Sequence, residues 1–275
     1  IKMQLMINAV QIDDIILKNS DKKSTLYLIS HDHKDVATPK SVPIHTSNIV
    51  ANILARDNII GTFIYSELPR TYVIHNITVY VFATEHSYGS VGYFVPRVGV
   101  LFMGDGRITS RVMSCITEIR DQVRICYIDT LFDEHDFMSI ESSLGLLRTL
   151  IEACRTHEVC VEVSHSSVLK YLSAEYLCRS HDVPKLELYK SMSTIPKPTT
   201  TVSVARKCDA DALTIRLCAR IFFLEQSGPV VLTSTGFRVF IAFHASRSEN
   251  DRLRQYLEPT VEFRPVDHSK KLFLL

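Results

Sequence analysis

The stretch ISHDHKDVA, residues 29–37, follows an apolar run and carries polar side chains on alternate positions. In an extended segment alternate side chains project to the same side, so His31, His33 and Asp35 can face one point. Imidazole and carboxylate groups are ligands of zinc, and a catalytic zinc site keeps one position open for water. The stretch therefore predicts a metal site at the end of a strand. A solvated polar turn that happens to contain histidines is the alternative interpretation.

Two later stretches supply further candidate ligands. TEHSYGSVGYF, residues 84–94, presents His86 after a strand-like run, and GVLFMGDGR, residues 99–107, ends an apolar strand with Asp105 between two glycines. Each could be structural by itself, because Gly-Asp-Gly is a common turn. Together with the first stretch they complete a set of four ligands at strand ends of one domain: His31, His33, His86 and Asp105.

Composition limits the class of protein. The chain has 275 residues, an apolar fraction of 46% and a formal net charge of +1, so the overall charge gives no argument for a nucleic-acid partner. No apolar run reaches the roughly 18–20 residues that span a bilayer, and we expect no membrane partner. The first residues lack the pattern of a secretory signal. The seven cysteines form no CxxC pair and are expected to be reduced thiols of an intracellular protein.

The distribution of strands and helices predicts two domains. Short strand-like runs crowd the first third of the chain, with one helix among them, and strand–helix alternation typical of a parallel α/β layer follows Gly106. The helices are predicted at residues 47–58, 139–157, 167–181 and 248–259. Ser47 or Asn48 is expected to cap the first of these helices, and Ser139 or Ser142 the second. We expect residues 1–130 and 232–275 to form one domain, with residues 131–231 inserted as another.

Six short segments, taken in order, resemble a known family. They are Ile12-Asp13, His31–Asp35, His86–Val91, Met103–Arg107, Tyr127–Thr130 and Phe243–Glu249. The first four are similar to the pattern Asp, His-x-His-x-Asp-His, His-x-x-Gly-Ser-Val and Thr-Gly-Asp-Phe-Arg of the metallo-β-lactamase-fold nucleases of the β-CASP group. The last two resemble the aspartate of the first cap motif and the Phe-His-Ser-Ser segment of that group. The resemblance is greatest to its DNA cross-link-repair branch.

The resemblance implies an α/β fold, an αββα metallo-β-lactamase sandwich with an inserted α/β β-CASP cap. It implies that the four ligands above hold one zinc ion, which supplies a Lewis acid and acidifies a water molecule. Asp35 is expected to orient or deprotonate that water, His244 to act on the phosphate or the leaving oxygen, and Asp129 to make hydrogen bonds from the cap side. Asp13 is expected either to support the ligands or to cap a turn.

Two positions depart from the family pattern. Val36 stands where the family has a histidine ligand of a second metal, so a second site formed by Asp35, Asp105 and His244 is expected to be impaired. Gly106 replaces the phenylalanine of Gly-Asp-Phe-Arg, which removes an apolar contact behind Asp105. We therefore expect one zinc ion and a weak or empty second position.

The resemblance implies a zinc-dependent DNA nuclease that processes DNA ends, with a nuclear location or, alternatively, an organellar one. A catalytically degenerate homologue that serves as a structural subunit of a nucleic-acid-containing complex is the first alternative, and an RNA-processing nuclease is the second. DNA is favoured over RNA, and protein partners fit the degenerate alternative. The candidate phosphate-neutralising residues, which could equally form a solvated face, are Arg206, Lys207, Arg216, Arg220, Arg238, Arg247, Arg252 and Arg254.

Overall fold

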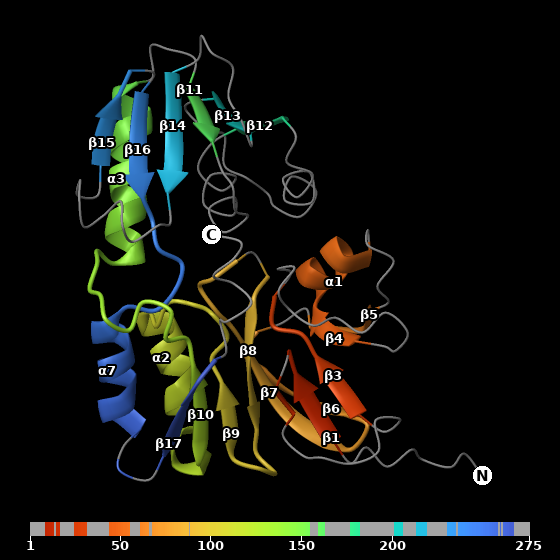
Figure 1. The fold of residues 1–275 in the computed structure, drawn as a ribbon. Coiled ribbons are helices and arrows are strands. Elements are labelled where there is room, and N and C mark those ends of the chain that lie inside the picture. Colours follow the sequence, from red (N-terminus) through yellow and green to blue (C-terminus); the bar gives the residue numbers. More distant parts are fainter. Residues whose placement is uncertain are drawn as a thin grey trace. The chain divides into compact units, whose positions relative to one another are not determined.

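Two compact units make up the chain (Figure 1). The computed structural model describes residues 9–13, 15–16, 25–31, 44–55, 61–65, 68–87, 89–154, 159–162, 177–181, 201–205, 213–218, 230–234, 236–257, 259 and 261–266. Unit 1 consists of Ile1–Asp136 and His244–Leu275, and unit 2 consists of Phe137–Phe243. Residues 131–136 group with unit 1, whereas the sequence assigned them to the inserted domain. Residues 232–243 group with unit 2, whereas the sequence assigned them to the first domain.

The two differences have physical causes. Residues 131–136 are tied to the returning segment of unit 1, because the backbone N–H of Arg247 donates to the carbonyl oxygen of His135 at 2.9 Å. Strands β15 (Val230–Thr233) and β16 (Gly236–Phe240) extend the sheet of unit 2, in which β16 pairs in parallel with β14 (Leu213–Cys218). Strand pairing therefore holds residues 232–240 in unit 2.

The first sheet of unit 1 is mostly parallel. Its described strands follow the order β2–β1–β3–β4–β5, and only β2 runs antiparallel to its neighbour. The strands are β1 (Ala9–Ile12), β2 (Ile15–Ile16), β3 (Thr25–Leu28), β4 (Ile44–Ser47) and β5 (Gly61–Tyr65). Asp13, with φ of 49°, lies at the turn from β1 to β2, where an aspartate tolerates the left-handed conformation better than most residues.

The second sheet of unit 1 has the order β17–β10–β9–β8–β7–β6. Its strands are β6 (Arg70–Ile74), β7 (Ile77–Ala83), β8 (Val91–Val95), β9 (Val100–Phe102), β10 (Ile125–Ile128) and β17 (Glu262–Pro265). From β6 to β9 the pairing is antiparallel, whereas β10 runs parallel to both β9 and β17. The chain therefore returns from unit 2 to complete an edge of this sheet.

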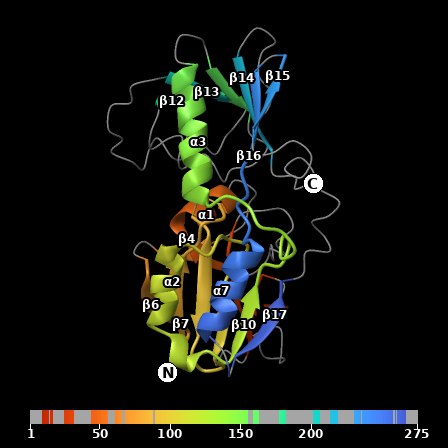
Figure 2. The same cartoon turned by 90° about the vertical axis from the view of Figure 1, so that its left-hand side faces the viewer.

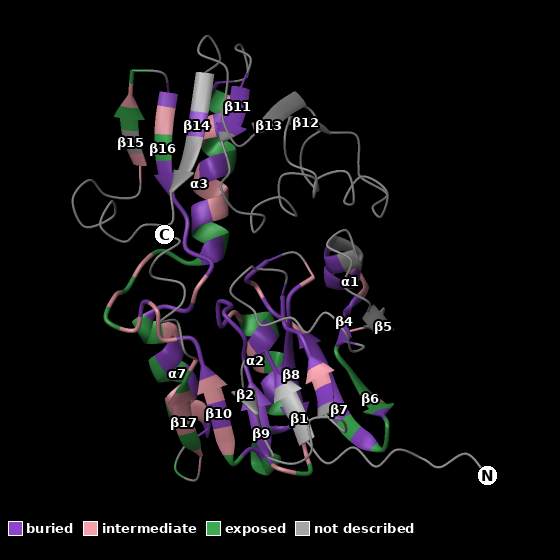
Figure 3. Cartoon of the chain, turned by 45° about the vertical axis from the view of Figure 1, so that its right-hand side comes forward, coloured by how far each residue is buried: buried purple, intermediate pink, exposed green. Residues whose placement is uncertain are grey.

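The middle strands of the second sheet, β7, β8 and β9, are buried on both faces (Figure 3). On β7, Val79 and Val81 contribute to the core shared with Leu26 and Leu28 of the first sheet. The alternate residues Tyr80 and Phe82 contribute instead to a core with two helices. Because successive side chains of a strand point to opposite faces, the near-continuous apolar run of β7 is typical of a strand covered on both sides.

Helices cover the outer faces of the two sheets (Figures 1 and 2). Helix α1 (Asn48–Ala55) packs Val50 and Leu54 against Ile29 and Ile44 of the first sheet. Helices α2 (Ser110–Thr117) and α7 (Arg247–Leu257) bury apolar residues against the second sheet, and a 3₁₀ turn (Arg120–Gln122) follows α2. The layers of unit 1 run helix, sheet, sheet, helix, as the resemblance implied, and the predicted mixed α/β class is confirmed.

Gly92 on β8 is expected to tolerate no larger residue. A Cβ atom built there lies 2.3 Å from Cζ of Phe82, whose ring is fully buried, and 3.0 Å from the carbonyl oxygen of Phe102. Gly92→Ala should therefore lower the free energy of unfolding by about 1–3 kcal/mol, measured by urea denaturation. Gly145→Ala is the control, because a Cβ there meets nothing within 4 Å and helix propensity favours alanine. Equal stability of the two variants would contradict the prediction.

Unit 2 contains a sheet whose described strands follow the order β12–β13–β11–β14–β16–β15 and are parallel except for β15. The strands not yet given are β11 (Val159–Glu162), β12 (Leu177–His181) and β13 (Thr201–Ala205). Helix α3 (Ile140–Ala153) runs alongside this sheet, capped by Ser139, whose hydroxyl accepts from the N–H of Ser142. The prediction of a helix over residues 167–181 is wrong at its end, because Leu177–His181 pairs with β13.

Two expectations from composition can be compared with the structure. Cys115, Cys126 and Cys154 are free thiols, but Cys160 is disulfide-bonded, so the prediction of seven reduced cysteines is wrong at that position. Among the described residues, no helix is both long and apolar enough to cross a bilayer.

Candidate metal centre

Three of the predicted ligands come together in unit 1. His31 follows β3, His86 follows β7 and Asp105 follows β9, and one ligand atom from each lies within 4.8 Å of the other two. Nε2 of His31 is 3.4 Å from Oδ2 of Asp105, and the ring centroids of His31 and His86 are 4.9 Å apart. All three side chains are buried. The first sheet thus supplies one ligand and the second sheet supplies two.

Asp13 and Ser30 orient the ring of His31. Both carboxylate oxygens of Asp13 accept hydrogen bonds from Ser30, one from its N–H at 2.8 Å and one from its hydroxyl at 2.5 Å. The same hydroxyl oxygen lies 2.6 Å from Nδ1 of His31. Because the single hydroxyl proton goes to the carboxylate, Nδ1 of His31 must donate. This leaves the lone pair on Nε2, which faces Asp105, as a metal ligand requires. Asp13 therefore contacts His31 through Ser30, and it also lies at the turn from β1 to β2.

A hydroxyl network holds the loop that carries His86. Ser90 Oγ donates towards the carbonyl oxygens of Ser87 and Thr84, at 2.7 and 3.2 Å, and accepts from the N–H of Ser87 at 3.1 Å. The backbone closes the same loop, since Thr84 N–H donates to the carbonyl of Ser90. Val91 N–H then donates to the carbonyl of Ser30, which links this loop to the one that bears His31. Ser90 belongs to the Gly-Ser-Val segment that resembles the family, whereas Ser30 was not singled out from the sequence, although it directly precedes a predicted ligand.

The loop after β9 presents Asp105 through two glycines of different function. Gly104 adopts φ of 66°, a conformation that glycine reaches without strain. Gly106 lets two backbones approach, because a Cβ there would lie 3.1 Å from the N atom of Glu85 and 3.3 Å from that of His86. From the sequence, Gly106 was expected to remove an apolar contact behind Asp105. In the structure this glycine also allows the Asp105 loop to pack directly on the His86 loop.

An aspartate–histidine pair lies beside the three ligands. Nδ1 of His244 is 2.6 Å from Oδ2 of Asp129, and the ring centroid of His244 is 4.8 Å from that of His86. The other carboxylate oxygen of Asp129 accepts from the N–H of Leu131 at 3.0 Å. Asp129 is buried, whereas 14% of the His244 side chain is exposed. The two residues that the sequence assigned to catalysis in the cap motifs are thus in contact.

The remaining predicted site residues lie outside the described part of the chain. They are His33 and Asp35, together with Val36, on which the predicted weakness of the second metal position depends. The fourth ligand and the composition of a second site therefore stay predictions.

The arginines of the returning segment are already engaged within unit 1. Arg247 forms an ion pair with Asp136 at 2.8 Å, and Arg254 forms ion pairs with Asp133 and Asp251. The first contact lowers the pKa of Asp136 to about 2, because the guanidinium and the N–H of Ser248 donate to its carboxylate. The positive charge of these two arginines is therefore partly neutralised.

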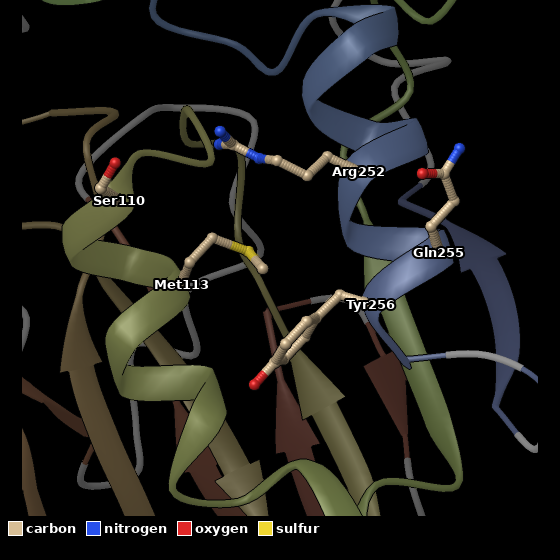
Figure 4. A pocket seen from close by; sticks show the side chains of 5 residues that line it. All are labelled: Ser110, Met113, Arg252, Gln255 and Tyr256. Atoms are coloured by element: carbon tan, nitrogen blue, oxygen red, sulfur yellow. The ribbon is translucent and has the colours of Figure 1, made fainter.

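A cavity of about 460 Å³ lies between α2 and α7, and no candidate metal ligand lines it (Figure 4). Its lining residues are Ser110, Met113, Arg252, Gln255 and Tyr256. None of them is a candidate ligand or a member of the aspartate–histidine pair, so this cavity is not where the chemistry of the site is arranged.

The sequence matches no protein-family model and no curated protein. Its fold has a counterpart in a protein of unknown function from Enterococcus faecalis V583. The TM-score is 0.62 at 13% identity, over 90% of this chain and 76% of that chain. At such an identity the similarity shows a shared fold alone.

Three other solved structures overlap more weakly. Metallo-β-lactamases from Pontibacter korlensis and of the type IND-7 each give a TM-score of 0.24 at 19% identity, over 30% and 32% of this chain and 42% and 43% of theirs. A mutant flavo di-iron protein from Thermotoga maritima gives 0.29 at 10% identity, over 90% of this chain and 75% of that chain. Scores this low give no information on function.

The donor set fits a metal ion. Two imidazoles and one carboxylate converge within 4.8 Å, and Ser30 holds the ring of His31 with its lone pair towards the other two. Such a mixed nitrogen and oxygen set suits zinc or iron. The cluster therefore has the chemistry of a metal site.

Proposed function

We propose that this protein is a metal-dependent phosphodiesterase that cleaves DNA, similar to Artemis and other β-CASP nucleases of the DNA cross-link-repair branch. One observation carries the proposal: the His31–His86–Asp105 cluster lies beside the Asp129–His244 pair, with ring centroids of His86 and His244 4.8 Å apart. A metal cluster and an adjacent carboxylate-supported imidazole are the parts that metal-assisted hydrolysis needs.

In this proposal His31, His33, His86 and Asp105 hold one zinc ion. That ion, when bound, supplies a Lewis acid for a phosphoryl oxygen and acidifies a water molecule. Asp35 orients the water or removes its proton. Asp129 accepts a hydrogen bond from Nδ1 of His244 and so favours the protonated imidazole, whose Nε2 serves to neutralise the phosphate or to give a proton to the leaving oxygen.

Unit 2 acts in this proposal as the β-CASP cap. It is inserted between Asp129 and His244 in the sequence, as the resemblance requires. We propose a nuclear protein that works on DNA ends, with a role in repair.

The second candidate function is a structural subunit that has lost catalysis. It is favoured by Val36, which stands at the position of a histidine ligand and cannot donate a lone pair. Retention of His31, His86 and Asp105 in one buried cluster favours the active enzyme.

The test is metal content together with cleavage of single-stranded and hairpin DNA. We expect the wild type to hold about one zinc per chain. His86→Ala should lose the metal, and its cleavage rate should fall at least about 10³-fold, because a bound metal contributes several kcal/mol to such reactions. His75→Asn is the matched control, since His75 is an exposed turn residue outside the cluster and asparagine tolerates its φ of 47°.

Different results would overturn different parts of the proposal. Two tightly held metal ions per chain would contradict the single site, and wild-type cleavage that survives His86→Ala and chelation would contradict a metal mechanism. A wild type that holds zinc but cuts nothing, and gains cleavage in Val36→His, would establish the degenerate alternative.

A further inference from the structure

An ion pair between a buried arginine and a partly buried glutamate links the Asp105 loop to helix α7. Nε of Arg107 lies 3.1 and 2.8 Å from the two carboxylate oxygens of Glu249. The Arg107 side chain is 1% exposed and that of Glu249 is 14% exposed, although 142 residues separate them in the sequence. Arg107 is two residues after the candidate ligand Asp105, and Glu249 is in the first turn of α7.

The carboxylate of Glu249 also holds the chain just after His244. It accepts from the N–H of Ser246 at 3.1 Å, and the N–H of Glu249 donates in return to the hydroxyl of Ser246 at 3.4 Å. This reciprocal arrangement is a capping box at the start of α7. A single carboxylate thus contacts Arg107 on one side and the backbone two residues after His244 on the other.

A second arginine connects the same two elements in the opposite direction. Arg252 extends from α7 towards the start of α2 (Figure 4), and its Nη2 donates to the carbonyl oxygen of Ile108. The segment 105–108 is therefore bound to α7 at two points.

We propose that Arg107 and Glu249 are a positioning pair. The pair fixes the position of His244 relative to Asp105, so that His244, as the proton donor, and the metal ligands act on one phosphate. This inference rests on the proposed function for its catalytic part, but it also concerns the metal site alone. Each of the two acts through the loop next to it, Arg107 through the Asp105 loop and Glu249 through the segment after His244.

The physical argument is the cost of the buried pair. Desolvating a guanidinium and a carboxylate offsets much of their attraction, so apolar residues of similar size often give equal or greater stability. Stability by itself is therefore a weak reason to find this pair here. Its geometry offers something that an apolar contact does not, because the Nε–H of Arg107, shared between the two carboxylate oxygens, and the N–H of Ser246 both donate to one carboxylate and fix one loop against the other.

The experiment compares three variants in the full chain. Glu249→Gln preserves the size of the side chain but loses one of its two acceptor atoms and the charge. Arg107→Met/Glu249→Leu removes both charges together, so that neither is left buried alone. Arg264→Ala is the control, because it breaks an exposed ion pair with Glu262 within β17 and Arg264 is not among the candidate phosphate-neutralising residues.

The readouts are the zinc dissociation constant from competition with a chelating dye, kcat and KM for single-stranded DNA, and the urea midpoint. For Glu249→Gln and the double variant we expect kcat about 10–100-fold lower, KM within about 2-fold, and zinc affinity about 10-fold weaker, as for other residues that orient metal ligands. We expect the double variant to keep a urea midpoint close to that of the wild type, and the control to match the wild type in every readout.

Several outcomes decide the matter. Wild-type zinc affinity and kcat in either folded variant would overturn the inference, as would losses that only follow the fraction of unfolded protein. If the wild type binds zinc but cleaves no DNA, the nuclease proposal fails, and weaker zinc binding in the two variants still supports the positioning pair. If the double variant does not fold, Glu249→Gln alone decides by the same two criteria.

Discussion

Asp129→Asn is expected to lower kcat for DNA cleavage by about 10²–10⁴-fold without removing the metal. The N–H of Leu131 donates to one oxygen of Asp129, which fixes the carbonyl of an asparagine on that side. In the wild type, Nδ1 of His244 lies 2.6 Å from a carboxylate oxygen of Asp129. In the variant the NH₂ group of the asparagine faces Nδ1 instead, and an N–H donor cannot bond to another N–H donor. The imidazole is forced into the other tautomer and loses the charge that favours its protonated form.

The measurement is a pH–rate profile with zinc content determined on the same samples. Asp136→Asn is the matched control, because Asp136 pairs with Arg247 at the surface, with 45% of its side chain exposed, and does not contact His244. Loss of zinc in Asp129→Asn would mean that this residue acts on the metal site rather than on His244. An unchanged kcat would exclude the pair from catalysis.

Buried His45 is expected to make the protein less stable in mild acid, by up to about 3 kcal/mol. Burial, followed by the proximity of His75, lowers the pKa of His45 from 6.5 to about 4. The unfolded chain therefore binds more protons than the folded one between these two values. The contribution of neutral His45 to the free energy of unfolding is fully present above pH 6.5 and is lost as the pH falls from 6.5 through 4.

Urea denaturation of the wild type and of His45→Gln between pH 4 and 7 measures this effect. Other groups titrate in the same range, so the difference between the two proteins carries the prediction: the unfolding free energy of the wild type should fall more steeply towards pH 4. Parallel curves would show that His45 titrates alike in both states. His75→Asn, which removes the second cause of the shift, should reduce the steepness in part.

Local patterns were sufficient for several parts of the fold. Helix α7 consists mainly of charged and polar residues and buries Leu253 and Leu257. Helix α3 begins after Ser139, one of the two serines expected to cap it. Helix α2 was not predicted, because Ser110–Thr117 is short and its residues have modest helix propensity. Its stability comes from Val112 and Ile116 packing on the second sheet, a contact that no local pattern contains.

The candidate site shows the same division. His31, His86 and Asp105 could be proposed because each ends an apolar strand with a ligand type, and strand ends of one domain tend to meet. The supports of these ligands were not predictable in that way. The hydroxyl of Ser90 turns back on its own loop, and Glu249 meets Arg107 only after the whole of unit 2 has intervened. Ser90 and Glu249 lie in segments that resemble the family, but the partners that they contact become apparent only in the folded chain.

Because α7 and β17 are synthesised after unit 2 but belong to unit 1, unit 1 is completed last during translation. Synthesis delivers β10 long before β17, its neighbour on one side, and completes the sheet of unit 2 in between. During that interval the nascent unit 1 has an open strand edge, and the apolar face later covered by Leu253 and Leu257 meets water. Exposed edges and faces of this kind favour aggregation. Completion of unit 1 is therefore a late, post-insertion event, and slow translation through residues 137–243 prolongs the period in which the nascent chain depends on chaperones.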